Sequence, residues 1–163
     1  MALNTAEYIQ LSSLLKQARA DLAAIELAAD PQNVLQLRLA TAVAEIAADC
    51  GQSEEALALS RATLEFIDRR GLSAPLALMH ARLNVVRGWM ERRSGHGGEA
   101  IAALQVAEAT QAQWLDASSP RLAQTRVHLA MGLALQGAAD EARVFLARAR
   151  AGFATHSRLA PYY

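Results

Sequence analysis

Residues 129–149 read LAMGLALQGAADEARVFLARA, and this stretch carries three features that recur earlier in the chain. A small residue, Ala130, stands seven places before Gly137, and the pair Glu141-Ala142 begins four places after that glycine. The glycine predicts the end of a helix, because glycine readily adopts the left-handed conformation that closes one. The glutamate predicts the start of the next helix, where a negative charge meets the positive end of the helix dipole. The stretch therefore predicts two helices joined by a short turn.

The same spacing surrounds two earlier glycines, Gly51 and Gly95. The matching small residues and Glu-Ala pairs are Ala44 with Glu55-Ala56, and Gly88 with Glu99-Ala100. Small residues at these places let the helices of a pair approach closely. Because one pair cannot bury its apolar face alone, three copies predict stacked pairs that share a continuous core.

The four prolines follow a similar interval. They are Pro31, Pro75, Pro120 and Pro161, separated by 44, 45 and 41 residues. Proline is tolerated at the start of a helix, where its missing N–H costs nothing, so the first three predict helix starts. A residue one or two places before each of these prolines is expected to accept hydrogen bonds from the first turn through its side chain. These residues are Asp30, Ser73 and Ser119.

Helical periodicity of apolar residues and the short connections predict an all-α chain of about seven helices, with consecutive helices antiparallel. The predicted helices span 5–29, 31–50, 53–70, 75–94, 98–116, 120–136 and 139–155. We expect one domain over residues 1–163, with repeats at 30–72, 73–118 and 119–157. The helix over 5–29 precedes the repeats and is expected to cap their first pair, with Lys16, Gln17, Arg19 and Asp21 turned toward water.

The charge balance argues against a general nucleic-acid binder. Lys and Arg number 16, Asp and Glu also number 16, and phosphate binding needs a basic surface. The single cysteine, Cys50, excludes an internal disulfide and favours a cytoplasmic location. The sequence shows no apolar run long enough to span a membrane and no signal peptide, so we expect no membrane partner.

The sequence resembles the tetratricopeptide repeat family, in its long-period variant seen in kinesin light chains and in helical sensor regions of bacterial regulators. The resemblance covers about residues 31–155 and is closest over residues 122–153. There the pattern positions are Leu129-Ala130, Gly137, Glu141-Ala142 and Ala149. The second repeat matches at Gly88, Gly95, Glu99-Ala100 and Ala107, and the first departs from the pattern with Thr63 in the last position. The resemblance implies a right-handed α-solenoid of helix hairpins.

In that family the first helix of each pair lines a concave groove that binds a partner. By position, the resemblance implies that this groove contains Arg38, Thr41 and Glu45, then Arg82, Val85 and Trp89, with Arg92 as a further candidate, then Gln124, Val127, His128 and Met131. The steps of three, four and seven residues place such side chains on one helix face. Trp89, Val127 and Met131 have an alternative reading as core residues.

Several patterns that resemble catalytic or metal sites favour a structural reading. Ser13 and Lys16 have the Ser-x-x-Lys spacing of penicillin-binding enzymes, but the other motifs of that group are absent. The glycine-rich run 95–98 lacks the strand and the Gly-Lys of a phosphate loop. Cys50 is expected to be a small buried residue. The histidines stand apart from carboxylates and cysteines in the sequence, so we predict no enzyme, metal or cofactor site. They are His80, His96, His128 and His156.

We predict that the chain is a cytoplasmic protein-interaction module, the docking or sensory part of a bacterial signalling or regulatory system. A second hypothesis is self-association as a dimer or scaffold, or a fragment of a larger regulator. It rests on the expectation that the last helix leaves an apolar face open, formed by Val144, Phe145, Ala149 and Phe153. Under both hypotheses the partner is another polypeptide.

Overall fold

The computed structural model describes residues 5–27, 34–70 and 73–154, which contain helices and no strand. The helices are α1 (Thr5–Leu27), α2 (Val34–Asp49), α3 (Ser53–Arg70), α4 (Ala74–Arg93), α5 (Gly97–Trp114), α6 (Pro120–Leu135) and α7 (Ala139–Ala154). The predicted all-α class is confirmed. The predicted helix over 53–70 has the predicted limits, and those after it differ by one or two residues at their ends. Asp30, Pro31 and Pro161 lie outside the described residues.

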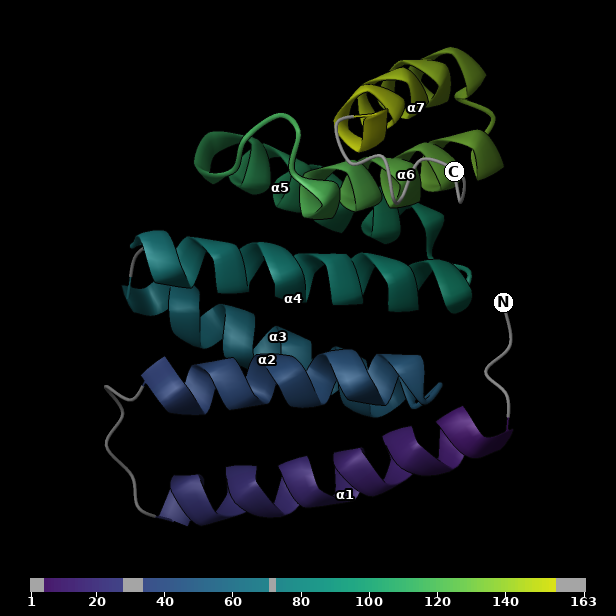
Figure 1. Ribbon diagram of the computed structural model, residues 1–163. Helices are drawn as coiled ribbons and strands as arrows, with labels where there is room; N and C mark the ends of the chain where they lie inside the picture. The colour runs from purple at the N-terminus through teal and green to yellow at the C-terminus, as the bar shows by residue number, and fades with distance from the viewer. Residues whose placement is uncertain (1–4, 28–33, 71–72, 155–163) are drawn as a thin grey trace.

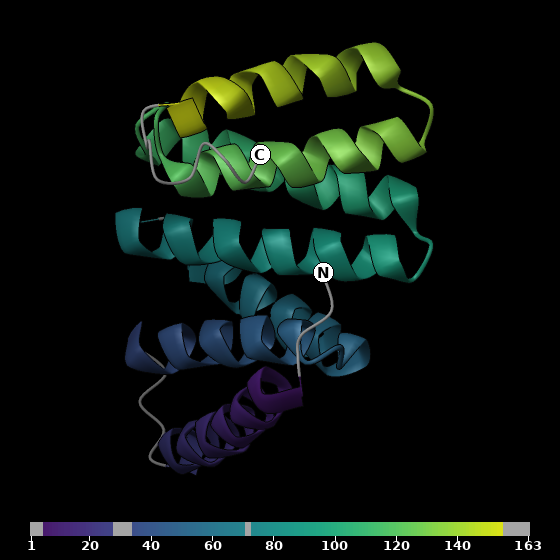
Figure 2. The same cartoon turned by 45° about the vertical axis from the view of Figure 1, so that its right-hand side comes forward.

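The helices stack in chain order, from α1 at one end to α7 at the other (Figure 1). Each described helix packs against its neighbours in the chain, and α4 also packs against α2 and α6. The helices α2, α4 and α6 therefore form one continuous row, with α3 and α5 packed behind it (Figures 1 and 2). This row brings together side chains that are far apart in the sequence.

One type of turn ends the first helix of each pair. Gly51, Gly95 and Gly137 have φ values of 76°, 84° and 81°, so all adopt the left-handed conformation that the sequence predicted. Two backbone hydrogen bonds close each turn: around Gly137, the Gly137 N–H donates to the Ala134 carbonyl and the Ala138 N–H to the Leu133 carbonyl. The other two turns repeat both bonds at equivalent positions. The recurring glycine is thus the local cause of the recurring hairpin.

The expected side-chain caps are absent at the two helix starts that the structure describes. Ser73 and Ser119 are the residues before α4 and α6, but neither side chain makes a capping hydrogen bond. Their backbone carbonyls accept only the first ordinary helical bonds, from the N–H groups of Ala77 and Ala123. Proline is part of the reason at α4, because Pro75 occupies its second position and lacks one of the two N–H groups that a cap would bind.

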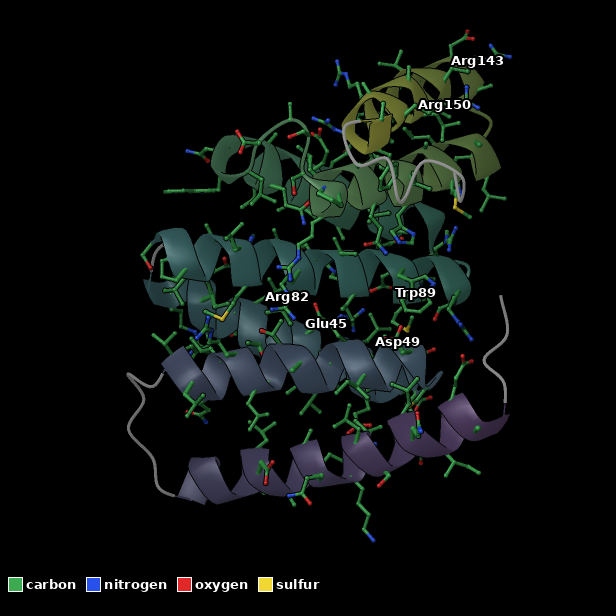
Figure 3. All side chains as sticks on the ribbon, viewed as in Figure 1. Glu45, Asp49, Arg82, Trp89, Arg143 and Arg150 are labelled. Atoms are coloured by element: carbon green, nitrogen blue, oxygen red, sulfur yellow. The ribbon has the colours of Figure 1, made fainter. Side chains whose placement is uncertain are left out.

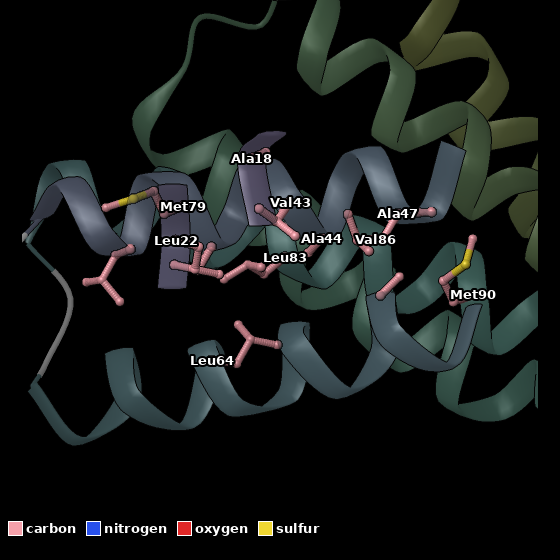
Figure 4. Packing of buried hydrophobic residues seen from close by; sticks show 14 of the residues in the cluster. Ala18, Leu22, Val43, Ala44, Ala47, Leu64, Met79, Leu83, Val86 and Met90 are labelled. Carbon is pink, nitrogen blue, oxygen red and sulfur yellow. The ribbon is translucent and has the colours of Figure 1, made fainter. Parts of the chain in front are cut away.

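The core depends on small residues where helices meet. Ala44 is fully buried in the larger hydrophobic cluster, which is built from α1 to α4 (Figure 4). Ala56, Ala100 and Ala142 are buried at the starts of α3, α5 and α7, as expected from the Glu-Ala pairs. At Gly88 of α4 a Cβ atom would lie 2.5 Å from Leu104 Cγ of α5. The closest helix contact in the second pair therefore requires glycine.

Helix α1 covers one end of the first helix pair, α2 and α3, which would otherwise face solvent. Leu15, Ala18 and Leu22 are buried in the larger cluster, while Lys16 and Gln17 face water. The Arg19 guanidinium reaches α3, where it binds the Glu55 carboxylate. The predicted capping role of this helix agrees with these contacts.

A buried carboxylate joins three segments near the end of α4. Glu91 is 1% exposed and accepts hydrogen bonds from Arg61 of α3 and from the His96 ring in the turn before α5. Burial raises the pKa of Glu91, but the bonds from His96 and Arg61 outweigh burial and hold it below its usual value. The Glu91 carboxylate is therefore ionised and fully partnered.

Replacing Gly88 with alanine should destabilise the protein, because the new methyl group meets Leu104 Cγ at 2.5 Å and the Ala100 carbonyl oxygen at 3.0 Å. We expect a loss of about 1–3 kcal/mol in the free energy of unfolding, measured by urea denaturation. Gly98→Ala is the matched control, since a Cβ atom there meets nothing within 4 Å. That variant should be as stable as the parent or slightly more so. Equal stability of the two variants would contradict the close approach at Gly88.

The stability contributed by Glu91 should depend on pH. A carboxyl whose pKa is lowered by folding stabilises the folded state above its unfolded pKa, near 4.5, and this contribution disappears as the pH falls through the folded pKa. Glu91→Gln should therefore cost about 1–2 kcal/mol at pH 7 and progressively less in acid. Urea denaturation from pH 7 to pH 3 measures the difference. Glu65→Gln, which removes an exposed ion pair with Arg69, should leave the pH profile unchanged.

Candidate functional site

A pocket of about 500 Å³ lies along the row formed by α2, α4 and α6. We call it the α2–α4–α6 pocket. Its lining residues are Glu45, Ala48 and Asp49 of α2, Arg82, Val85, Val86 and Trp89 of α4, Gln111 of α5, and Arg121, Gln124, Thr125 and His128 of α6. Within each helix of the row, these residues lie three, four or seven places after the first of them, so they share one face. The stacking of the repeats then aligns the three faces.

An ion pair joins the walls of the pocket. The Arg82 Nε donates to Glu45 Oε1 at 2.7 Å, and its Nη2 donates to the other carboxylate oxygen (Figure 3). The side chains are 32% and 33% exposed, so the pair is partly shielded from water. The forked hydrogen bond that Arg82 donates to Glu45 raises the pKa of Arg82 above its usual value, against the opposing effect of burial. The pair therefore fixes α4 against α2 and neutralises both charges.

Asp49 and Trp89 lie together at one end of this row of side chains (Figure 3). Trp89 is partly buried against the larger hydrophobic cluster, and the Arg93 guanidinium lies 5.9 Å from the centroid of its ring. Asp49 is an exposed residue whose carboxylate is partly desolvated at the pocket wall, and this desolvation, and then the nearby Glu45, raise its pKa above the usual value. No cation contributes to that shift. Asp49 is therefore a carboxylate without a compensating charge, beside an aromatic ring.

Two buried polar atoms at the pocket have no hydrogen-bond partner in the described part of the chain. They are Gln111 Oε1 of α5 and His128 Nδ1 of α6. Gln111 is only 4% exposed. Burial, and then the charge of Arg92, lower the pKa of His128 below its usual value, so the ring is neutral at neutral pH. The pocket therefore contains unused hydrogen-bonding capacity from two different helices.

The structure brings most of the predicted groove residues into this pocket. Glu45, Arg82, Val85, Trp89, Gln124 and His128 all line it. Both interpretations of Trp89, as a groove residue and as a core residue, apply, because it lines the pocket and also packs on the core. Arg38 is exposed and Arg92 partly buried, and neither belongs to the lining.

Three predicted groove residues occupy other environments. Thr41 is fully buried, and its hydroxyl donates to the Leu37 carbonyl at 2.7 Å. Val127 packs against the cluster of Ala123, Ala149 and Phe153, in agreement with its alternative reading as core. Met131 is 45% exposed and lies outside the pocket lining, so it fits neither reading. Positions chosen at steps of three or four residues drift around a helix that has 3.6 residues per turn. Some of the predicted positions therefore point away from the groove.

Six lining residues were missed from the sequence: Ala48, Asp49, Val86, Gln111, Arg121 and Thr125. Asp49 follows Glu45 by four places, and Arg121 and Thr125 precede Gln124 and His128 by three, so these residues lie about one turn from predicted ones. Gln111 comes from a helix not expected to contribute. The sequence feature that could have indicated Gln111 is its spacing. It is a polar residue that continues, along α5, the series of buried residues Ala100, Ala103, Leu104 and Ala107.

The open face predicted on α7 is smaller than expected. Ala149 and Phe153 are buried against Ala123 of α6, and Phe145 packs against the cluster around Leu129 and Leu133. Val144, 49% exposed, and Leu146, 42% exposed, remain open to solvent. Because they are two places apart on a helix, they point in different directions and form no continuous patch.

The patterns set aside in the sequence have structural surroundings. Ser13 and Lys16 lie on the exposed surface of α1, and Gly95 closes the turn before α5. Cys50 is partly exposed rather than buried, and burial and then Asp49 raise the pKa of its thiol. Two histidines do have carboxylate partners brought near by the fold: His80 Nε2 lies 3.2 Å from Asp68, and His96 binds Glu91. Among the described residues, no group of three or more His, Cys, Asp or Glu side chains is arranged to hold a metal ion.

Comparisons with known proteins add no family assignment. The chain matches no family model, and no curated protein matches its sequence. Across the part of the chain that the structure describes, the helices are too short or too polar to cross a membrane.

A double-mutant cycle should measure the ion pair across the pocket. Glu45→Ala and Arg82→Ala should each destabilise the protein, and the double variant should lose less than the sum of the two. We expect a coupling energy of about 0.5–1 kcal/mol at low salt, decreasing as salt screens the charges. Urea denaturation of the four proteins at two salt concentrations provides the measurement. Strictly additive losses would show that the two charges do not interact.

Proposed function

We propose that the chain is a protein-interaction module that binds a segment of a partner protein along the α2–α4–α6 pocket. The observation that carries this proposal is the convergence of Trp89, the Glu45–Arg82 pair and unpartnered polar groups on one face built from successive repeats. Tryptophan and arginine are the residue types that most often anchor protein interfaces. Exposed polar residues at its edge, such as Asp49, Arg121 and Gln124, provide the polar rim that such interfaces have.

The arrangement supports an architecture of stacked helix hairpins, and we propose that it is a short right-handed α-solenoid of the tetratricopeptide type. Support comes from the three equivalent turns at Gly51, Gly95 and Gly137 and from the continuous row of α2, α4 and α6. The resemblance to the long-period variant suggests a docking or sensory role in a bacterial regulatory system, in the cytoplasm. Self-association is the weaker candidate, because α7 exposes only the separated apolar side chains Val144 and Leu146 among its large residues.

Site-specific photo-crosslinking tests whether the pocket contacts a partner. A photoreactive amino acid is placed at Gln124, an exposed residue of the pocket, and the protein is expressed in its native host. We expect a defined crosslinked product, whose second polypeptide is identified by mass spectrometry. The product should decrease strongly when Arg82→Ala and Trp89→Ala are combined in the same chain, because both side chains line the pocket.

The matched control places the photoreactive group at Gln105, an exposed residue of α5 outside the pocket lining. That position should give no such product. A product of equal yield from Gln105 and Gln124, or one unaffected by the double replacement, would exclude the pocket as the binding surface. Circular dichroism of the double variant verifies that the helices remain folded.

A further inference from the structure

Two buried atoms of the α2–α4–α6 pocket, Gln111 Oε1 and His128 Nδ1, receive no hydrogen bond from the described residues. Gln111 Oε1 accepts only, and His128 Nδ1 accepts when the neutral ring carries its proton on the other nitrogen. Both atoms are buried and have no partner among the described residues. Leaving a buried polar group unpaired costs free energy, so a group that supplies N–H donors to these atoms gains more than it would at an exposed surface.

The α2 side of the pocket attracts positive charge. Two carboxylates, Glu45 and Asp49, lie one helical turn apart on this wall, and Arg82 neutralises only the first. Asp49 has neither an ion pair nor a side-chain hydrogen bond within the described residues. Trp89 forms the adjoining wall, and an indole ring can stack with a guanidinium group, as it does with Arg93 at 5.9 Å from its centroid.

Other classes of ligand fit these walls less well. An anion would meet two carboxylates on the α2 side, where Arg82 is already bound by Glu45, while the second cation of the lining, Arg121, is an exposed residue in the first turn of α6. An apolar side chain would cover Gln111 Oε1 and His128 Nδ1 without giving them a partner. A lysine brings charge but only three donors at one point, whereas a guanidinium group has five donors in a plane and stacks on aromatic rings.

We propose that the α2–α4–α6 pocket recognises the side chain of an arginine on the partner segment. The guanidinium pairs with the Asp49 carboxylate beside Trp89, and its remaining N–H groups face the acceptors of Gln111 and His128. This inference rests on the proposed function, because it names the side chain by which a bound polypeptide is anchored. Specificity then comes from Gln111 and His128, which a ligand lacking donors leaves unpaired.

Fluorescence titration with a model of the arginine side chain tests the proposal directly. The chain has two tryptophans, so Trp114→Phe leaves Trp89 as the only tryptophan reporter. Trp114 is an exposed residue outside the pocket lining, and its replacement should not disturb the site. N-acetyl-L-arginine methylamide should give a saturable change, with a dissociation constant on the order of 1 mM for so small a probe. The citrulline analogue, which has nearly the same shape and no charge, should give none over the same range.

Two variants in the Trp114→Phe background locate the binding groups. Asp49→Asn should weaken binding of the arginine probe about tenfold or more. Glu54→Gln removes one exposed carboxylate of α3 outside the pocket and should leave binding unchanged. Gln111→Leu should weaken binding while keeping or raising the melting temperature, because it replaces an unpartnered buried polar group with an apolar one. Equal binding of arginine and citrulline, or full binding by Asp49→Asn, overturns the proposal.

The crosslinking and titration experiments separate this inference from the proposed function. If Gln124 crosslinks to a partner whose bound segment contains no arginine, or whose binding is unaffected by Asp49→Asn, the pocket binds a polypeptide but the arginine assignment is wrong. If the probe binds as described and no groove-specific crosslink forms, the assignment of the pocket stands and the protein-interaction function fails.

Discussion

Helices approach closely only where little side chain separates their backbones, and this protein meets that requirement at equivalent places in each repeat. Gly88 of α4 packs directly against Leu104 of α5, and Ala44 and Ala130 occupy the corresponding positions in α2 and α6 with no more than 1% exposure. The small residues set how closely each pair packs, and the glycine turns set its direction. Together they hold α2, α4 and α6 in one row, without which the pocket residues would not converge.

Some buried polar groups in this protein have hydrogen-bond partners within the fold, and others have none among the described residues. Glu91 receives bonds from two other segments and so joins α3, α4 and the following turn. The hydroxyls of Thr41, Thr63 and Thr125 return to carbonyls of their own helices. Gln111 Oε1 and His128 Nδ1, in contrast, remain unpartnered at the same pocket. Ser60 Oγ and Arg87 Nε are also unpartnered among the described residues but lie outside the pocket lining, so it is the meeting of Gln111 and His128 at one pocket that makes them available to a ligand.

Much of the fold could be predicted from the sequence because glycine turns and helix-start charges act locally. The site was predicted only in part, because it depends on the rotation of each helix about its own axis. Thr41 was assigned to the groove although it faces the core, while Asp49, eight residues later on the same helix, was missed although it faces the pocket. Ion pairs such as Glu45 with Arg82 join residues from different repeats, so no local pattern indicates them. The side-chain caps predicted at Ser73 and Ser119 are absent, and at α4 Pro75 removes one of the N–H groups that such a cap would bind.

Each described helix contacts only helices one or two places away along the chain. Such short-range connectivity gives a low contact order, so the chain can fold quickly by adding one hairpin to the next rather than by closing long loops. The same connectivity means that the helices should detach one after another under mechanical force. Under tension applied to its two ends, it would peel from the outer helices inward, and the central pair of α4 and α5, covered on both sides, would be the last to yield.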